Sequence, residues 1–274
     1  MDRWNVYRNG FVAGGVMGQG NNLTTTDLPF TDAGIKTFGR IGRLSGNTNT
    51  IPINLDYNME SQDCYKYIGK TVVLSFYYRT GANFSASSII ANIYRGTGTD
   101  QALRSTYTGS TNTTATLSTS TNWAIYSFTA NIPSSANQIS IEFYYYPTGT
   151  AGAADYFDIT GVQLELGSVA TPFEVRPYPV ELGLCMRYYQ KFVVSCGGGA
   201  TPTAANKQFF CVVNFPVPLR VWAAPVIYNT FVSVNASLSD TLSNYGNTFI
   251  CFRVYNVSAN DLDYRAAYSI SAEL

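Results

Sequence analysis

The heptapeptide VVLSFYY, residues 72–78, carries the pattern that decides the fold. Successive side chains of a β-strand point to opposite faces of a sheet, so an apolar residue at every second position forms one continuous face. Here Val72, Leu74, Phe76 and Tyr78 share such a face. This two-residue period predicts a strand with one side in a hydrophobic core.

The same rhythm recurs through the first 175 residues, between short polar turns. It marks residues 89–94, 123–129, 139–146 and 156–166, and turn segments lie at 96–100 and 147–150. The Thr/Ser-rich stretch 105–122 has a sparse apolar pattern and is predicted to be a long loop with a weak strand. Many short strands at this spacing predict a two-sheet β-sandwich, most simply a jelly roll.

Three prolines, Pro172, Pro177 and Pro179, interrupt this pattern, and a helix is predicted over residues 181–192. Its apolar face holds Leu182, Cys185, Met186 and Tyr189. A second strand series is predicted at 209–215, 225–228, 231–238, 248–257 and 267–274. We therefore expect an all-β chain: a jelly roll over 1–175, a connector with one short helix over 176–192, and a smaller C-terminal β-sandwich over 193–274.

The composition excludes several classes of function. Only 12% of the 274 residues are charged, and 17 Lys and Arg balance 17 Asp and Glu, so there is no basic surplus for binding nucleic acid. The sequence contains no histidine, which excludes Ser-His-Asp and Cys-His catalysis and histidine-ligated zinc. Met1 leads directly into Asp2-Arg3-Trp4 and no long apolar segment follows, so we expect neither a signal peptide nor membrane insertion.

The five cysteines are odd in number and widely spaced. This pattern does not resemble a disulfide framework or a zinc site, so we expect buried free thiols and assembly in a reducing cytosol.

Outward-facing tyrosines are the best candidates for binding. Ile139, Ile141, Phe143 and Tyr145 would share the core face of the strand 139–146. The residues predicted to face outward from this strand and from 89–94 are Asn92, Tyr94, Glu142, Tyr144 and Tyr146. Aromatic rings beside amide and carboxylate groups suit a glycan. The same surface would also suit a subunit interface, where tyrosine is enriched.

A glycosidase would need two carboxylates facing each other across a cleft. The nearest candidates are Glu142, Asp155, Asp158 and Glu165, but their spacing is not diagnostic. Non-catalytic binding is therefore the preferred interpretation.

One long stretch supports a family resemblance. Residues 162–174, VQLELGSVATPFE, continue through Arg176-Pro177-Tyr178 into residues 181–191, ELGLCMRYYQK. This stretch resembles a signature of tail-fibre-like virion proteins of tailed bacteriophages that contain a carbohydrate-binding-module-like jelly roll. Weaker matches occur in the same order at 2–4, 74–77, 123–133, 215–220 and 271–274, so the resemblance covers nearly the whole chain.

This resemblance implies a non-enzymatic virion surface protein that is assembled in the host bacterial cytoplasm and binds a host cell-surface glycan and other virion proteins. Members often carry an N-terminal anchoring region, whereas this sequence opens at the jelly roll, which leaves a fibre subunit or a capsid decoration open. Related jelly rolls often hold a structural calcium, and Asp158 occupies a matching place; no other cofactor is implied.

The C-terminal domain and the helix before it are expected to form oligomers. Residues 209–213 and 249–252 are apolar on both faces, which is typical of strands buried on both sides. With the family resemblance, this predicts a homotrimer whose interface includes Leu182, Cys185, Met186, Tyr189, Phe210 and Phe252. Three hypotheses follow: a glycan-binding fibre or spike subunit, a structural capsid or tail protein that binds only other virion proteins, and a polysaccharide depolymerase.

Overall fold

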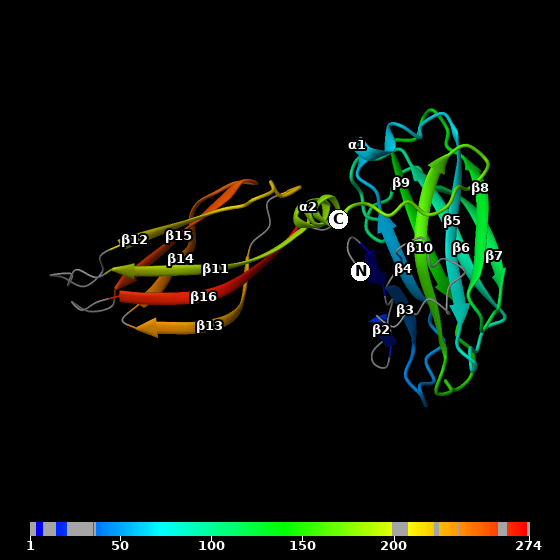
Figure 1. Ribbon diagram of the computed structural model, residues 1–274, viewed down its shortest axis with the longest axis horizontal. Coiled ribbons are helices and arrows are strands. Elements are labelled where there is room, and N and C mark those ends of the chain that lie inside the picture. Colours follow the sequence, from blue (N-terminus) through cyan, green and yellow to red (C-terminus); the bar gives the residue numbers. More distant parts are fainter. Residues whose placement is uncertain are drawn as a thin grey trace. The chain divides into compact units, whose positions relative to one another are not determined.

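The structure is a computed structural model that describes residues 4–7, 15–20, 35, 37–198, 208–221, 225–234, 236–256 and 262–272. These residues form two compact units, Met1–Val175 and Arg176–Glu273, each built from two antiparallel sheets (Figure 1). Neither described helix has the length and apolar character that a membrane span requires.

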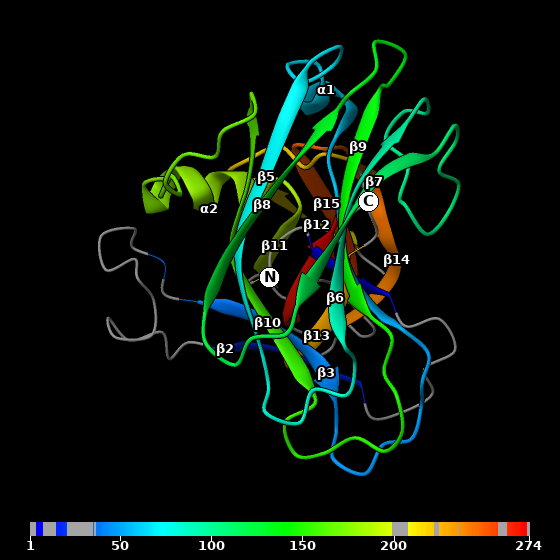
Figure 2. The same cartoon turned by 90° about the vertical axis from the view of Figure 1, so that its right-hand side faces the viewer.

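The first unit is a sandwich of two five-stranded sheets that lie face to face (Figure 2). Sheet A has the order β1 (Trp4–Tyr7), β4 (Ile53–Asn58), β9 (Gln138–Tyr145), β6 (Ser88–Gly96) and β7 (Thr111–Ser118). Sheet B has the order β2 (Gly15–Gly20), β3 (Phe38–Arg43), β10 (Tyr156–Leu166), β5 (Thr71–Thr80) and β8 (Ala124–Asn131). The central neighbours are distant in sequence, as in a jelly roll, which confirms the predicted fold class.

The core of this unit follows the predicted alternation. Leu74 and Phe76 of β5 are buried among the inner side chains of both sheets. Phe76 meets Phe143 of β9 edge to face, with ring centroids 4.8 Å apart, a favoured geometry for aromatic pairs. Strand β7, in the Thr/Ser-rich stretch, contributes Ala115 and Leu117 to the same core.

The second unit is a smaller sandwich of two three-stranded sheets. One sheet has the order β11 (Tyr189–Gly198), β16 (Leu262–Ser271) and β13 (Val226–Val234). The other has the order β12 (Gln208–Asn214), β15 (Phe249–Asn256) and β14 (Ala236–Tyr245). Phe252 and Tyr268 hold its core together, with ring centroids 4.6 Å apart.

The predicted helix is shorter than its apolar spacing indicated. Helix α2 spans Tyr178–Met186, and β11 begins at Tyr189, so residues 189–192 form a strand that pairs with β16. Their alternate side chains also fit a two-residue period, which the helical spacing obscured. The structure also contains a second short helix, α1 (Ser61–Cys64), which the sequence did not predict. The two strands expected at 225–228 and 231–238 do not match the observed boundaries, because β13 runs without a break from Val226 to Val234.

The expectation that all five cysteines are free thiols was wrong. Cys64, Cys185 and Cys251 are free, but Cys211 is disulfide-bonded. Cys64 is fully buried, and burial raises the pKa of its thiol to about 12. An odd count and wide spacing along the chain do not reveal which cysteines the strand pairing brings together.

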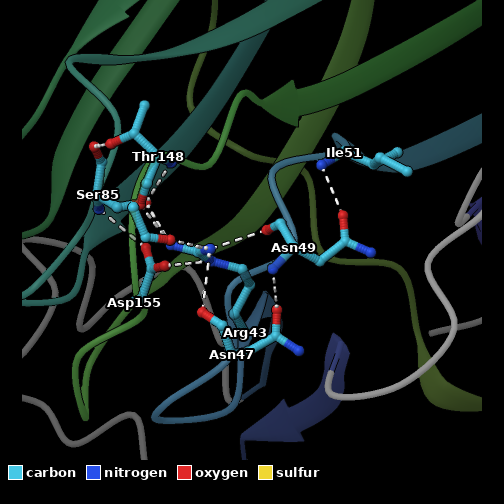
Figure 3. A network of polar contacts seen from close by, with 8 residues as sticks. Arg43, Asn47, Asn49, Ile51, Ser85, Thr148 and Asp155 are labelled. Atoms are coloured by element: carbon cyan, nitrogen blue, oxygen red, sulfur yellow. Dashed lines mark hydrogen bonds and ion pairs between the residues drawn. The ribbon is translucent and has the colours of Figure 1, made fainter.

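A fully buried ion pair ties together the loops at one end of the first unit (Figure 3). Arg43 Nε lies 2.7 Å from Asp155 Oδ2. The terminal nitrogens of Arg43 donate to the carbonyl oxygens of Asn49 and Thr148, both at 2.8 Å, and Ser85 N donates to Asp155 Oδ1 at 2.9 Å. Three loops are therefore fixed through one charge pair, and the polar groups that this pair buries are hydrogen-bonded.

Candidate functional site

The candidate site lies on the outer face of sheet A, opposite the core. Strand pairing sets Asp56 of β4 directly beside Glu142 of β9, and Glu142 beside Asn92 of β6. Asn92 in turn pairs with Thr114 of β7. Because side chains of directly paired residues share a face, four neighbouring strands place one row of polar groups across the sheet.

Hydrogen bonds join this row into a ladder. Asn54 Nδ2 donates to Glu142 Oε1 at 2.7 Å, and Asn92 Nδ2 donates to Glu142 Oε2 at 2.8 Å. Thr114 Oγ1 and Asn112 Nδ2 donate to Asn92 Oδ1 at 2.7 and 3.2 Å. Both carboxylate oxygens of Glu142 thus accept bonds from amides, which fixes the side chain.

One arginine forms ion pairs with two carboxylates in this row. Arg104 Nε donates to Asp56 Oδ2 at 2.9 Å, and Arg104 also forms an ion pair with Glu142. Burial raises the pKa of Asp56 above its ordinary value of 3.8, and the neighbouring Arg104 counteracts part of that rise. With Asp56 ionised, the cluster holds two negative charges and one positive charge.

Arg104 comes from a loop that folds over one end of this face. The segment 97–110, between β6 and β7, is here named the Arg104 loop. Leu103 N donates to Asn58 Oδ1 and Gln101 N donates to Gln138 Oε1, both at 2.9 Å. Asp100 and Ser61 exchange hydrogen bonds at 2.8 and 2.9 Å, so β4, β9 and α1 all hold the loop in place.

Three tyrosines surround the polar row and remain accessible. Tyr146 is 54% exposed, and Tyr94 and Tyr144 are half-buried. The rings of Tyr144 and Tyr146 meet at right angles, with centroids 5.4 Å apart. Burial raises the pKa of Tyr94 and of Tyr144, and the neighbouring Tyr146 raises that of Tyr144 further. These two hydroxyls therefore stay protonated at neutral pH.

The structure brings the five predicted glycan-binding residues together, but it corrects the exposure of two. Asn92 and Glu142 point away from the core, yet they are only 2% and 1% exposed, because neighbouring side chains and the Arg104 loop cover them. Asn92 and Glu142 are therefore buried beneath the tyrosines, where their hydrogen bond links β6 to β9. The groups that a ligand would meet are Tyr94, Tyr144 and Tyr146.

Sequence reasoning missed Asp56, Asn54 and Arg104. The two β4 residues had a signal, since INLDYN, residues 53–58, places asparagine, aspartate and asparagine on one face. Arg104 had none, because it lies in a loop 48 residues from its partner Asp56.

The four carboxylates considered for catalysis do not converge. Glu142 belongs to sheet A, whereas Asp158 and Glu165 lie on β10 of sheet B. Asp155 is held by Arg43 in the loop network. Burial alone would raise the pKa of Glu165, but hydrogen bonds from Thr171 and Gln163 together outweigh burial and lower it. This set of four cannot form a glycosidase pair.

The calcium predicted at Asp158 does not fit the structure. Arg40 donates to both Asp158 oxygens, Nε to Oδ1 at 2.7 Å and Nη2 to Oδ2 at 2.9 Å. Arg79 Nε donates to Oδ2 at 2.8 Å. Two guanidinium cations already compensate this carboxylate, and calcium needs six to eight oxygen ligands. Within the described residues, no group of three or more His, Cys, Asp or Glu is placed to hold a metal ion.

The predicted interface residues separate into two groups. Phe252 is fully buried in the core of the second unit, so it cannot contact another subunit. The others are half-buried or exposed: Leu182, Cys185 and Met186 on α2, Tyr189 on β11 and Phe210 on β12. Phe210 is 57% exposed, so β12 has one open face and is not covered on both sides.

Comparisons with known proteins gave matches only among solved structures. Models of protein families gave no match, and a search of curated proteins gave none either. The enzymatically active domain of tailspike protein 4 of bacteriophage CBA120 is 11% identical, with a TM-score of 0.40, over 60% of this chain and 19% of that chain. This chain therefore spans about a fifth of that protein's length.

Two similar structures are carbohydrate-binding modules. The CBM22-1 xylan-binding domain from Paenibacillus barcinonensis Xyn10C is 11% identical, with a TM-score of 0.35, over 61% of this chain and 87% of that one. TmCBM61, in complex with β-1,4-galactotriose, is 10% identical, with a TM-score of 0.34, over 61% and 88%. All three TM-scores are below 0.5, so the assignment of the fold rests on the strand order described above.

Proposed function

We propose that this chain is a non-catalytic surface subunit of a tailed-bacteriophage virion, and that it attaches to a host cell-surface glycan through the outer face of sheet A. The sequence signature at residues 162–191 supports the virion assignment. In this proposal the protein is assembled in the host cytoplasm and is displayed on the virion as a tail fibre, spike or fibre-like subunit.

The observation that carries the glycan proposal is that three partly exposed tyrosines surround the row of hydrogen-bonded polar side chains on sheet A. Tyr94, Tyr144 and Tyr146 offer ring surfaces and hydroxyls, and the ladder below them fixes their strands in register. Sugars present both C–H faces and hydroxyl groups, so rings beside polar groups match both parts of the ligand.

The geometry of the carboxylates supports binding rather than hydrolysis. A glycosidase needs one carboxyl group to give a proton and another to act as nucleophile or base. Asp56 and Glu142 are both buried and share Arg104, and amides occupy both oxygens of Glu142. Neither group is placed to reach a substrate.

We also propose that the second unit forms a homo-oligomer, a homotrimer by the family resemblance. It exposes Phe210 and Val212 on β12 and Val193 on β11. Burying such side chains between subunits would be favourable. Repeated copies of a weak sugar site would raise avidity by about 10²–10⁴ without any new contact.

The test is a glycan array probed with the wild type and with Tyr144→Ala and Tyr94→Ala. Tyr65→Ala is the matched control, because Tyr65 is exposed in the same unit but follows helix α1 and is not on a strand of sheet A. We expect glycan binding to fall at least tenfold in the two site variants, since stacking and hydrogen bonding are both lost, about 1.4 kcal/mol or more. Light scattering should show an unchanged oligomer.

Other outcomes would contradict the proposal. Unchanged binding in both site variants would remove this face as the binding site. Absence of binding by the wild type, with incorporation into virions retained, would favour a structural subunit that binds only other virion proteins. Release of new reducing ends from host polysaccharide, abolished by Glu142→Gln or Asp56→Asn, would establish a depolymerase instead.

A further inference from the structure

A second charged cluster lies on the opposite sheet of the first unit. On the outer face of sheet B, strand pairing aligns Arg40 of β3 with Asp158 of β10, and Asp158 with Arg79 of β5. The two arginines therefore flank one carboxylate. Asp158 is fully buried, whereas the side chains of Arg40 and Arg79 are 31% and 24% exposed.

Aromatic rings hold the two guanidinium groups in place. The Cζ atom of Arg40 lies 3.5 Å from the centre of the Tyr156 ring, and that of Arg79 lies 4.7 Å from the Trp123 ring. Phe38 lies between them, with its ring centre 5.5 and 5.3 Å from the two Cζ atoms. Each arginine is stabilised by cation–π contact and has little freedom to turn away.

The cluster has more hydrogen-bond donors than it uses. Arg40 gives Nε and Nη2 to Asp158, and Arg79 gives only Nε, so Nη1 of Arg40 and both terminal nitrogens of Arg79 are not used by this carboxylate. The indole N–H of Trp123 is buried and has no hydrogen-bond partner among the described residues. Two positive charges face one negative charge, so the cluster keeps a net positive charge.

We propose that the Arg40–Arg79 cluster binds an oxyanion, either the carboxylate of an acidic sugar or the phosphate of a sugar phosphate. Guanidinium groups recognise both through paired N–H donors. The shared Asp158 and the aromatic contacts fix both groups before the ligand arrives, so little conformational freedom is lost on binding. This site does not depend on the glycan face of sheet A.

The test uses saturation-transfer NMR with glucuronate, glucose 6-phosphate and glucose as probes, each titrated against the intact protein. We expect the two anionic sugars to bind. Arg79→Gln and Arg40→Gln should each weaken their binding about tenfold or more, because a charge-assisted hydrogen bond is lost. Arg95→Gln on β6 of sheet A removes the same charge outside the cluster and should change nothing.

Two further readouts keep the test decisive. At about 1 M NaCl, where the screening length falls to roughly 3 Å, the wild type should lose most of its affinity for the anionic sugars, and this result needs no variant. Tyr144→Ala should leave their binding to the cluster intact, which separates this site from the glycan face. A preference for glucuronate or for glucose 6-phosphate would identify the oxyanion.

The proposal would be overturned if glucuronate bound Arg79→Gln and Arg95→Gln equally well. It would also be overturned if salt did not weaken binding, or if glucose bound the cluster as tightly as glucuronate. Arg79→Lys serves as a second variant if Arg79→Gln does not fold; it keeps the charge and removes the planar donor pair, so weaker binding is expected there too.

Discussion

The two outer faces of the first unit carry charge clusters of opposite composition. On sheet A, Asp56 and Glu142 share the single Arg104, whereas on sheet B, Arg40 and Arg79 share the single Asp158. Each cluster spans neighbouring strands that come together only in the folded sheet. With Asp56 ionised, the cluster on sheet A therefore has an excess negative charge, and the cluster on sheet B has an excess positive charge.

The buried ion pair Arg43–Asp155 has equal positive and negative charge, so it serves as the reference for the two clusters. It holds one charge of each sign, both completely buried, and its polar contacts stay within the protein. The unbalanced clusters are partly open through their arginine side chains. We infer that a buried cluster with equal numbers of positive and negative charges has a structural role here. A cluster with unequal charges and exposed arginine side chains is instead available to ligands.

The largest expected effect is on the balanced pair. Asp155→Ala leaves a buried, unpaired guanidinium, so the free energy of unfolding should fall by about 3–5 kcal/mol. Urea denaturation measures this loss. Glu181→Gln is the control, because its partner Arg176 and Glu181 are both well exposed, and it should cost less than about 1 kcal/mol. Similar losses in the two variants would contradict the structural role of the pair.

A smaller loss is expected from Asp158→Asn. This change leaves Arg40 and Arg79 facing each other without a counter-charge, but partial exposure of both side chains lets water screen them. We expect a destabilisation of about 2–3 kcal/mol by the same measurement. A reduced effect at high salt would support charge repulsion as the cause.

Glu142→Gln should cost less than Asp158→Asn, because it leaves Arg104 and Asp56 as a neutral pair. We expect a loss of about 1 kcal/mol, mainly because the introduced amide nitrogen cannot accept a hydrogen bond, so either Asn54 or Asn92 loses its acceptor. Parallel denaturant titrations of the two variants test the comparison directly. If Glu142→Gln were the more destabilising, the inferred charge imbalance of the two clusters would be wrong.

The smallest effect concerns pH. The folded-state pKa of Asp56 is raised by burial, so its contribution to stability is fully present below its ordinary pKa of 3.8 and is lost as pH rises through the folded value. Carbon-detected NMR of the Asp56 carboxyl should show a titration midpoint above 3.8. Arg104→Gln should move that midpoint still higher, because the arginine favours the charged carboxylate. A midpoint unchanged by that substitution would place Arg104 away from Asp56.

Much of the fold could be predicted because it follows local periodicity. The strand expected at 156–166 coincides with β10, and the alternation in residues 72–78 puts the apolar set of β5 in the core. The prediction of a helix was wrong beyond Met186, because the apolar residues there also fit the two-residue period of a strand and pair with β16. Local pattern alone does not decide between those two structures.

The site was harder to predict, because its chemistry depends on partners far apart in the chain. Alternation indicated that Glu142 points away from the core, but not that the Arg104 loop would cover it. The partners of Asp158 lie 118 and 79 residues away. Strand register brings these groups together, and register is set by the whole sheet.

The anchoring of the Arg104 loop has a consequence for how this protein could change its ligand. Asp100, Gln101 and Leu103, which directly precede Arg104, bind three different elements. An insertion or deletion within the loop would withdraw the guanidinium from two buried acids at once, at a cost to folding. Divergence towards new receptors should therefore proceed by exchange of Tyr94, Tyr144 and Tyr146, with the length of the loop kept constant.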